Sequence, residues 1–212
     1  MRVVVRVIAI DGPAGAGKST IARALAARLK LQYLDTGAMY RAVTCAALQR
    51  DISVEDRDLV AEVARELILD VQRDHVLIDG VDVTAAIRTP EITAAVSAVA
   101  ANSGVRAEMR ARQRAWVIER GGGVIEGRDI GSVVFPDAEL KLYLTASPRT
   151  RAQRRVAEVG GDVDQIERAI VARDLYDSSR ADSPLTTAHG SIVVDTTGLD
   201  INEVLAKIEA LT

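Results

Sequence analysis

A glycine-rich stretch near the start of the chain, residues 7–20 (VIAIDGPAGAGKST), constrains the fold more than any other feature of the sequence. The β-branched run at residues 3–10 predicts a strand that is buried on both faces. Residues 19–31 are rich in alanine and leucine at helical spacing, which predicts a helix. The loop between them matches G-x-x-x-x-G-K-[ST], a pattern that surrounds phosphate oxygens with backbone N–H groups at a helix start. We therefore expect ATP or GTP to bind to a strand–loop–helix unit.

Each residue type in this phosphate loop has a physical role. The glycines let the backbone turn inward, Lys18 adds a positive charge, and the Ser19 hydroxyl can ligate Mg²⁺. A switch GTPase is disfavoured, because it needs an N-K-x-D motif and neither Asn102 nor Asn202 precedes a lysine. The residues of the loop that we expect to bind ATP are Gly12, Pro13, Ala14, Gly15, Ala16, Gly17, Lys18, Ser19 and Thr20.

Further short apolar runs predict the rest of an α/β domain. Residues 123–126, 140–144 and 192–195, and a short strand near Tyr33, complete five parallel strands with helices between them. Residues 67–83 alternate in polarity and contain RD and DG turn signals, which predicts antiparallel strands. We expect one domain over residues 1–212, with a core of 1–65 and 97–212 and a β-rich insertion at about 66–96.

Composition limits the class of protein. The formal net charge of −3 disfavours a surface devoted to a nucleic-acid polymer. Cys45 is the only cysteine, which excludes an internal disulfide and fits a reducing cytoplasm. The sequence contains neither a signal peptide nor an apolar run of about 20 residues. We expect a cytoplasmic monomer that acts on small molecules away from membranes.

A second group of polar residues is expected at the carboxyl edge of the sheet, beside the phosphate loop. Arg41 comes soon after the second predicted strand, and ligands bind at such an edge in open α/β sheets. Glu126 ends another strand, where a carboxylate can hold the Mg²⁺ shell through water. Arg128 and Asp129 follow directly, in a turn that we expect to form part of an active site.

Arginines are concentrated in three predicted helical segments. In residues 105–119, Arg106 stands at the helix start and can reach a ligand, whereas we expect Arg110 and Arg114 to be solvated. Residues 146–158 contain Arg149, Arg151, Arg154 and Arg155. In residues 172–185, the offsets predict one helix face that carries Arg173, Asp177 and Arg180.

These charges favour phosphoryl transfer, because two anionic substrates repel each other and need cations around the moving group. His75 and His189 are expected at the surface, so no Ser-His-Asp set is indicated. The expected catalytic residues are Lys18, Arg128, Arg173 and Arg180.

The order and spacing of six segments resemble those of the bacterial cytidylate kinases along the whole chain. The segments are IDGPAGAGKST, YLDTGAMYRA, TPEITAAVSAVAA, EGRDIGSVVFPDA, RDLYDSSRADSPL and VVDTTGLDINEV. The resemblance implies a P-loop nucleoside monophosphate kinase fold, in which helices flank a five-stranded parallel sheet, with a β-rich insertion and a mobile lid at about residues 148–165. It also implies the reaction ATP + CMP ⇌ ADP + CDP, with dCMP accepted and Mg²⁺ required.

The resemblance further implies roles for individual residues. Ser97, Arg106 and Asp129 would read the cytosine, and Arg41, Arg128 and Arg180 would hold the CMP phosphate. Asp177 would contact the sugar with help from Arg173, and Thr36 would lie near the acceptor. Arg151 and Arg155 would close over ATP. Ser19 and Glu126 would hold Mg²⁺. Other small P-loop kinases, acting on UMP, AMP or shikimate, and a non-catalytic nucleotide-binding regulatory module stay open as alternatives.

Overall fold

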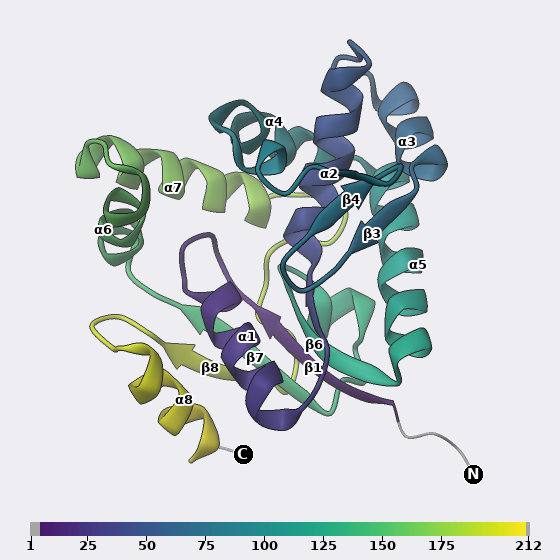
Figure 1. Ribbon diagram of the computed structural model, residues 1–212. Helices are drawn as coiled ribbons and strands as arrows, with labels where there is room; N and C mark the ends of the chain where they lie inside the picture. The colour runs from purple at the N-terminus through teal and green to yellow at the C-terminus, as the bar shows by residue number, and fades with distance from the viewer. Residues whose placement is uncertain (1–4, 211–212) are drawn as a thin grey trace.

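The central element is a parallel sheet of five strands. The computed structural model describes residues 5–210 (Figure 1). The sheet has the order β2-β6-β1-β7-β8, which confirms the prediction of five parallel strands. Its members are β1 (Arg6–Asp11), β2 (Tyr33–Asp35), β6 (Gly122–Gly127), β7 (Leu140–Thr145) and β8 (Ile192–Asp195). The first predicted strand includes residues 3 and 4, which lie outside the described residues.

Helices cover both faces of the sheet because its inner strands are apolar on both faces. In β1, Ile8 and Ile10 face a cluster that includes α1 (Lys18–Leu29) and α8 (Ile201–Glu209). Val7 and Ala9 point the other way, as alternate residues of a strand must. That second face is packed by α2 (Thr36–Gln49) and α5 (Ser103–Arg120), and α3 (Arg57–Glu66) packs against these two helices.

A separate three-stranded antiparallel sheet lies beside α2. It comprises β3 (Leu69–Val71), β4 (Val76–Ile78) and β5 (Val81–Asp82). The tight β4–β5 turn at Asp79 and Gly80 has positive φ at both residues, 50° and 81°, as a two-residue hairpin turn requires. The antiparallel strands predicted in residues 67–83 are confirmed. The chain returns to the main sheet through η1 (Ala86–Arg88), α4 (Pro90–Ala100) and α5.

Two helices stand apart from this second sheet, across the carboxyl edge of the main sheet (Figure 1). They are α6 (Pro148–Val159) and α7 (Val163–Ser178), which pack against each other. Gly160 and Gly161 join them with φ values of 75° and 107°, which residues with side chains rarely adopt. Between residues 5 and 210, no helix combines the length and apolar character needed to cross a bilayer.

Candidate active site

The phosphate loop joins β1 to α1 and contacts the end of β7. Gly12 has a φ of 145°, and a Cβ there would lie 2.0 Å from the carbonyl oxygen of Leu144. Only glycine fits this close approach of two backbones. Lys18 starts α1, is buried, and donates from Nζ to the Pro13 carbonyl at 2.7 Å. The loop and its lysine therefore form the compact cradle that the sequence predicts.

Lys18 lies in an environment that disfavours its own charge. Burial and then the charge of the neighbouring Arg128 lower the pKa of its ammonium group to about 7, against the attraction of Glu126 and Asp11. A phosphate group bound in the loop adds negative charge beside Nζ and favours the protonated form. The electrostatics of Lys18 thus fit an anionic ligand.

Glu126 is held at the end of β6 by groups from two other elements. The Tyr33 hydroxyl donates to its Oε1, and Thr36 Oγ1 donates to its backbone oxygen at 2.6 Å. Burial raises the pKa of the Glu126 carboxyl, the charge of Asp35 raises it further, and Lys18, Tyr33 and the Ser19 hydroxyl oppose the rise. Sequence reasoning did not identify Tyr33 as a partner of this carboxylate.

The oxygen atoms of Ser19 and Glu126 lie together, which fits the hard oxygen ligands that Mg²⁺ prefers. Within residues 5–210, no group of three or more acidic, histidine or cysteine side chains is arranged to hold a metal ion. Two oxygen ligands leave most of the coordination positions of Mg²⁺ open to water or to oxygens of a bound substrate.

Asp11 is a buried site residue that sequence reasoning missed. It ends β1, directly before Gly12, and its two carboxylate oxygens accept the backbone N–H groups of Ile130 and Gly131 at 2.8 and 2.7 Å. Burial raises the pKa of Asp11 to about 6 even though both hydrogen bonds oppose the rise. Asp11 therefore fixes the turn after β6, which carries Arg128 and Asp129, to the phosphate loop. The available signal was an acidic residue in an otherwise apolar strand end.

Asp177 joins two arginines that come from different parts of the chain. Its Oδ2 accepts from Nε of Arg128 at 3.1 Å, and its Oδ1 accepts from Arg180. The prediction of a helix face carrying Arg173, Asp177 and Arg180 is wrong at its end, because α7 stops at Ser178 and Arg180 follows in coil. The coil lets Arg180 fold back onto Asp177.

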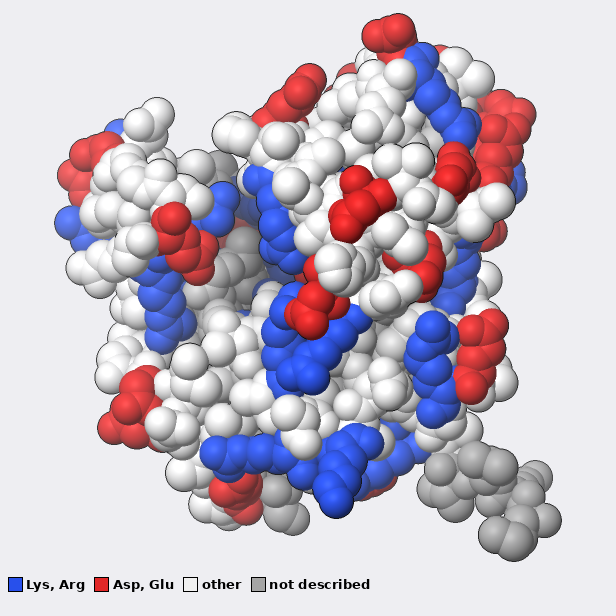
Figure 2. Space-filling view, in the orientation of Figure 1, with Lys and Arg blue, Asp and Glu red and all other residues white. Residues whose placement is uncertain are grey.

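Several guanidinium groups repel one another in this region. Burial lowers the pKa of Arg173 to about 10, and the charges of Arg128, Arg41 and Arg180 contribute to that shift against the attraction of Asp177. Arg41 reaches Asp35 at 3.2 Å, and Arg88, which the sequence did not indicate, lies on the same carboxylate oxygen at 3.8 Å. Figure 2 shows positive side chains along a hollow between the α6–α7 pair and the rest of the molecule.

A buried ion pair lies deeper than these arginines. Arg106, in the first turn of α5, donates to Asp129 and to the Ala100 carbonyl at 3.0 Å, and the Tyr40 ring lies 5.6 Å from its guanidinium carbon. Arg106 is 1% exposed. Ser97 is half-buried on α4, three residues before Ala100. Arg128 and Asp129 are adjacent in sequence but pair with different partners.

Arg110 is half-buried rather than solvated, whereas Arg114 is exposed, as the sequence predicted, although its guanidinium also binds the chain. Arg110 donates to Asp182 at 2.9 Å and to Ser183 Oγ at 3.1 Å. Arg114 donates to the backbone oxygens of Val133 and Val134, each at 3.1 Å. The same α5 face that carries Arg106 therefore binds the surrounding chain along its length.

The arginines of α6 differ in what they contact. Arg151 is buried and donates to the carbonyls of Ala146 and Ala14, each at 3.0 Å, and to Asp174 at 2.6 Å. The side chain of Arg155 is 43% exposed and pairs with Glu158 at 3.1 Å. Arg154 instead reaches toward the phosphate loop and donates to the Thr196 carbonyl at 2.7 Å. The structure therefore brings Arg151 and Arg154, but not Arg155, to the loop.

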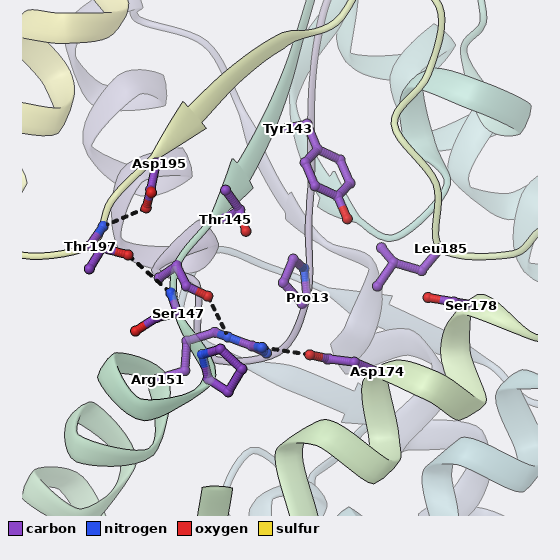
Figure 3. Close-up of a pocket in the computed structure, with 12 residues that line it drawn as sticks. Pro13, Tyr143, Thr145, Ser147, Arg151, Asp174, Ser178, Leu185, Asp195 and Thr197 are labelled. Carbon is purple, nitrogen blue, oxygen red and sulfur yellow. Dashed lines mark hydrogen bonds and ion pairs between the residues drawn. The ribbon is translucent and has the colours of Figure 1, made fainter.

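Arg151 and Asp174 also line a hollow of about 580 Å³ at the carboxyl ends of β7 and β8. Figure 3 shows this pair pointing toward each other, with Pro13 of the phosphate loop beside them. Tyr143, Ser147 and Leu185 complete parts of its wall. The pair thus ties α6 and α7 to the loop that binds phosphate.

The sheet order, the phosphate loop and the facing arginine cluster define a P-loop kinase: one anion site on the loop, and a second across the carboxyl edge of the sheet. The chain belongs to the cytidylate kinase family, whose model matches residues 8–212.

Curated relatives support this membership. A cytidylate kinase of Desulforamulus reducens is 49% identical over 209 residues, which cover 95% of this chain and 94% of that protein. A bifunctional pantoate ligase/cytidylate kinase of Synechococcus sp. is also 49% identical, over 96% of this chain but only 40% of its own length.

Among solved structures, an uncharacterized protein from Eubacterium ventriosum has a TM-score of 0.53 at 13% identity, covering 97% of each chain. A gluconokinase from Sinorhizobium meliloti has a TM-score of 0.51 at 13% identity, covering 98% of this chain and 94% of that one. These two similarities concern the fold alone.

Proposed function

We propose that this chain transfers the γ-phosphoryl group of ATP to CMP or dCMP and releases ADP with CDP or dCDP. The observation that carries the proposal is the buried Arg106–Asp129 pair beside a cluster of arginines that faces the phosphate loop. Family membership and the printed name of the Desulforamulus reducens relative support the same reaction. Small nucleotides are the substrates, and we propose that a single copy acts in the cytoplasm without a polymer or membrane partner.

The donor nucleotide would lie on the phosphate loop. Backbone N–H groups of residues 12–20 and the Lys18 ammonium would surround its β- and γ-phosphates. Arg151 would support ATP binding by holding the phosphate loop in place, since its guanidinium donates to the Ala14 carbonyl at 3.0 Å. Arg155 would join the donor only if α6 moves, because its present partner is Glu158.

The phosphate of CMP would bind to Arg41, Arg128 and Arg180, with Arg173 beside the transferring group. Burial and the charges of neighbouring guanidiniums lower the pKa of Arg173. An anion between these guanidiniums would relieve their repulsion, which supports this role. Asp177 would hold Arg128 and Arg180 in position to bind the phosphate and would also contact the sugar. The buried Thr36 would line the CMP-binding site near the acceptor.

The cytosine base would be read by Asp129, Arg106 and Ser97. A carboxylate accepts from the cytosine amino group, and a guanidinium donates to the ring acceptors. Uracil presents an oxygen where cytosine presents the amine, so Asp129 would face another acceptor. A buried mismatch of this kind strongly disfavours the wrong substrate.

Mg²⁺ would be held by Ser19 and by Glu126 through water. When bound, the ion supplies positive charge to the phosphate oxygens and orients them. Tyr33 would hold Glu126 in place by the hydrogen bond to its Oε1.

We propose that residues of about 148–165 form a lid that closes when both substrates are bound. Such closure excludes water and limits transfer to the bound acceptor. The glycine pair at Gly160 and Gly161 supports motion between α6 and α7. The insertion at about 66–96 would act as the part of the molecule that encloses the monophosphate.

The test is ADP formation from Mg-ATP in parallel reactions with CMP, dCMP, UMP, AMP, shikimate and no acceptor. We expect a rate increase with CMP and dCMP alone. A response to UMP or AMP instead would retain a kinase and overturn the base assignment. Acceptor-independent hydrolysis, or no turnover, would favour a nucleotide-binding regulatory module.

A further inference from the structure

Arg106 has a second carboxylate beside it that the proposed reaction does not use. Its Nε lies 3.7 Å from Oδ1 of Asp182, while its terminal nitrogens serve Asp129 and the Ala100 carbonyl. The buried Nε has no hydrogen-bond partner among the described residues. Arg106 is thus flanked by two carboxylates, and only Asp129 is a proposed base-reading group.

Asp182 is itself fixed by several contacts. Arg110, one helical turn after Arg106 on α5, donates to the same Oδ1 at 2.9 Å, and Ser183 Oγ donates to it at 2.8 Å. Burial opposes ionisation of Asp182, but the Ser183 hydroxyl and Arg110 outweigh it and lower the pKa of the carboxyl. Asp182 therefore presents a negative charge to both arginines.

The backbone near Asp182 adds a second observation. Ser183 is a buried residue with a φ of 53°, a conformation that costs free energy for a residue with a side chain. The same coil carries Arg180, two residues before Asp182, which holds Asp177. Contacts of Asp182 with α5 therefore determine how this coil passes the site.

We propose that Asp182 is a positioning residue for base recognition. This inference rests on the proposed function. Asp182 docks the coil after α7 onto α5 and, together with Asp129, holds the Arg106 guanidinium in one orientation. Cytosine N3 accepts a hydrogen bond whereas uracil N3 donates one, so a well-oriented guanidinium discriminates between the two bases. Arg110 strengthens the arrangement by holding Asp182 from the next turn of the helix.

The test is the Asp182→Asn variant, which keeps the shape of the side chain and removes its charge. We measure kcat and KM for CMP and for UMP. The ratio of kcat/KM for CMP to that for UMP should fall roughly 10-fold, as expected when a charge-assisted contact at a ligand-binding group is lost. The KM for CMP should rise while the KM for ATP changes less than about 2-fold, because the donor loop is untouched.

The CMP-to-UMP ratio is informative even if the variant folds poorly. Both values of kcat/KM scale with the concentration of folded enzyme, so the ratio does not depend on it. Arg110→Gln should also lower the CMP-to-UMP ratio. The double variant should have the same ratio as Asp182→Asn alone, because both changes disrupt the same set of contacts between Arg110, Asp182 and Arg106. Glu139→Gln, which breaks an exposed ion pair with Arg6, is the matched control and should leave the ratio unchanged.

Two results would overturn the inference. One is an unchanged CMP-to-UMP ratio in Asp182→Asn with lower rates for both substrates, which indicates a structural role alone. The other is additive effects of Asp182→Asn and Arg110→Gln on the ratio. A wild-type chain that does not prefer CMP would instead contradict the proposed function itself, so the two failures are distinguishable.

Discussion

At the scale of single residues, the site depends on carboxylates that lie away from solvent. Asp11 holds two backbone N–H groups of the turn that carries Arg128 and Asp129. Asp177 and Asp129 each hold an arginine from another segment. Arginines with long, flexible side chains lose rotamer freedom when they bind. Carboxylates that fix them beforehand reduce this cost at the moment of substrate binding.

Asp11 leads to a prediction about stability and pH. Its pKa is raised from 3.8 to about 6 by burial, so between these values the folded chain binds a proton that the unfolded chain has released. The stability that this group contributes is therefore greatest below pH 4 and falls as the pH rises to 6. Over this range, the free energy of unfolding should decrease more in the wild type than in Asp11→Asn, by up to about 3 kcal/mol.

Urea denaturation at several values between pH 4 and pH 7 measures this difference in slope. Asp74→Asn, which changes an exposed carboxylate paired with Arg23, serves as the control and should keep the wild-type slope. Equal slopes for Asp11→Asn and the wild type would show that Asp11 does not titrate in this range.

At the scale of elements, α5 organises the half of the molecule that would receive the acceptor. Along this helix, arginines bind the coil after α7, the end of α3, and the turn after β6. Arg112 alone donates to the carbonyls of Leu67, Ala64 and Arg65, at 2.6, 3.0 and 3.1 Å. These carbonyls lie in the last turn of α3 and directly after it, where helices leave acceptors without intrahelical partners.

Arg112→Ala should therefore destabilise the junction between α3 and the antiparallel sheet. We expect the free energy of unfolding to fall by about 1.5–3 kcal/mol, because a charged donor to several carbonyls is lost. Arg120→Ala, at the exposed end of the same helix, should cost less than about 1 kcal/mol. Hydrogen exchange should show the loss of protection concentrated in α3 and β3. A loss spread evenly over the chain would contradict this assignment.

At the scale of the whole molecule, charge is distributed unevenly. The formal net charge is −3, yet the hollow beside α6 and α7 is walled by positive side chains. Arg173 shows the consequence, since burial and the charges of neighbouring guanidiniums together lower its pKa to about 10. An anion placed among these arginines should stabilise the folded state of the entire chain.

CMP should therefore raise the melting temperature strongly. At about 100 times its Kd, a ligand adds about 2.7 kcal/mol of stability, which corresponds to roughly 5–10 °C for a domain of this size. Cytidine at the same concentration lacks the phosphate and should give a smaller shift. Arg173→Gln should raise the melting temperature without ligand, because it removes a positive charge that neighbouring guanidiniums repel. The same variant should show a smaller increase in melting temperature when CMP is added. Equal shifts with CMP and cytidine would contradict this view.

The local parts of the fold were predictable because their causes lie within a few residues of sequence. The phosphate loop is defined by glycines and a lysine at fixed spacing, and the strands by short β-branched runs between turns. The antiparallel strands of residues 67–83 were predictable for the same reason. The end of α7 was not, because the helical offset of Arg173, Asp177 and Arg180 continued past the point where the backbone turns away.

The sequence by itself therefore determined the phosphate-binding unit, the parallel sheet and the supply of arginines and carboxylates. Only the tertiary structure decided which carboxylate meets which arginine. Asp129 meets Arg106 rather than its neighbour Arg128, and Asp177 meets Arg128 across 49 positions of sequence. The physical reason is that β6 lies beside β1 near the centre of the sheet, so the turn that follows β6 contacts residues from distant segments of the chain. Such pairings depend on the sheet order and on the path of the coil after α7. Neither can be predicted from the spacing of residues within a short segment of sequence.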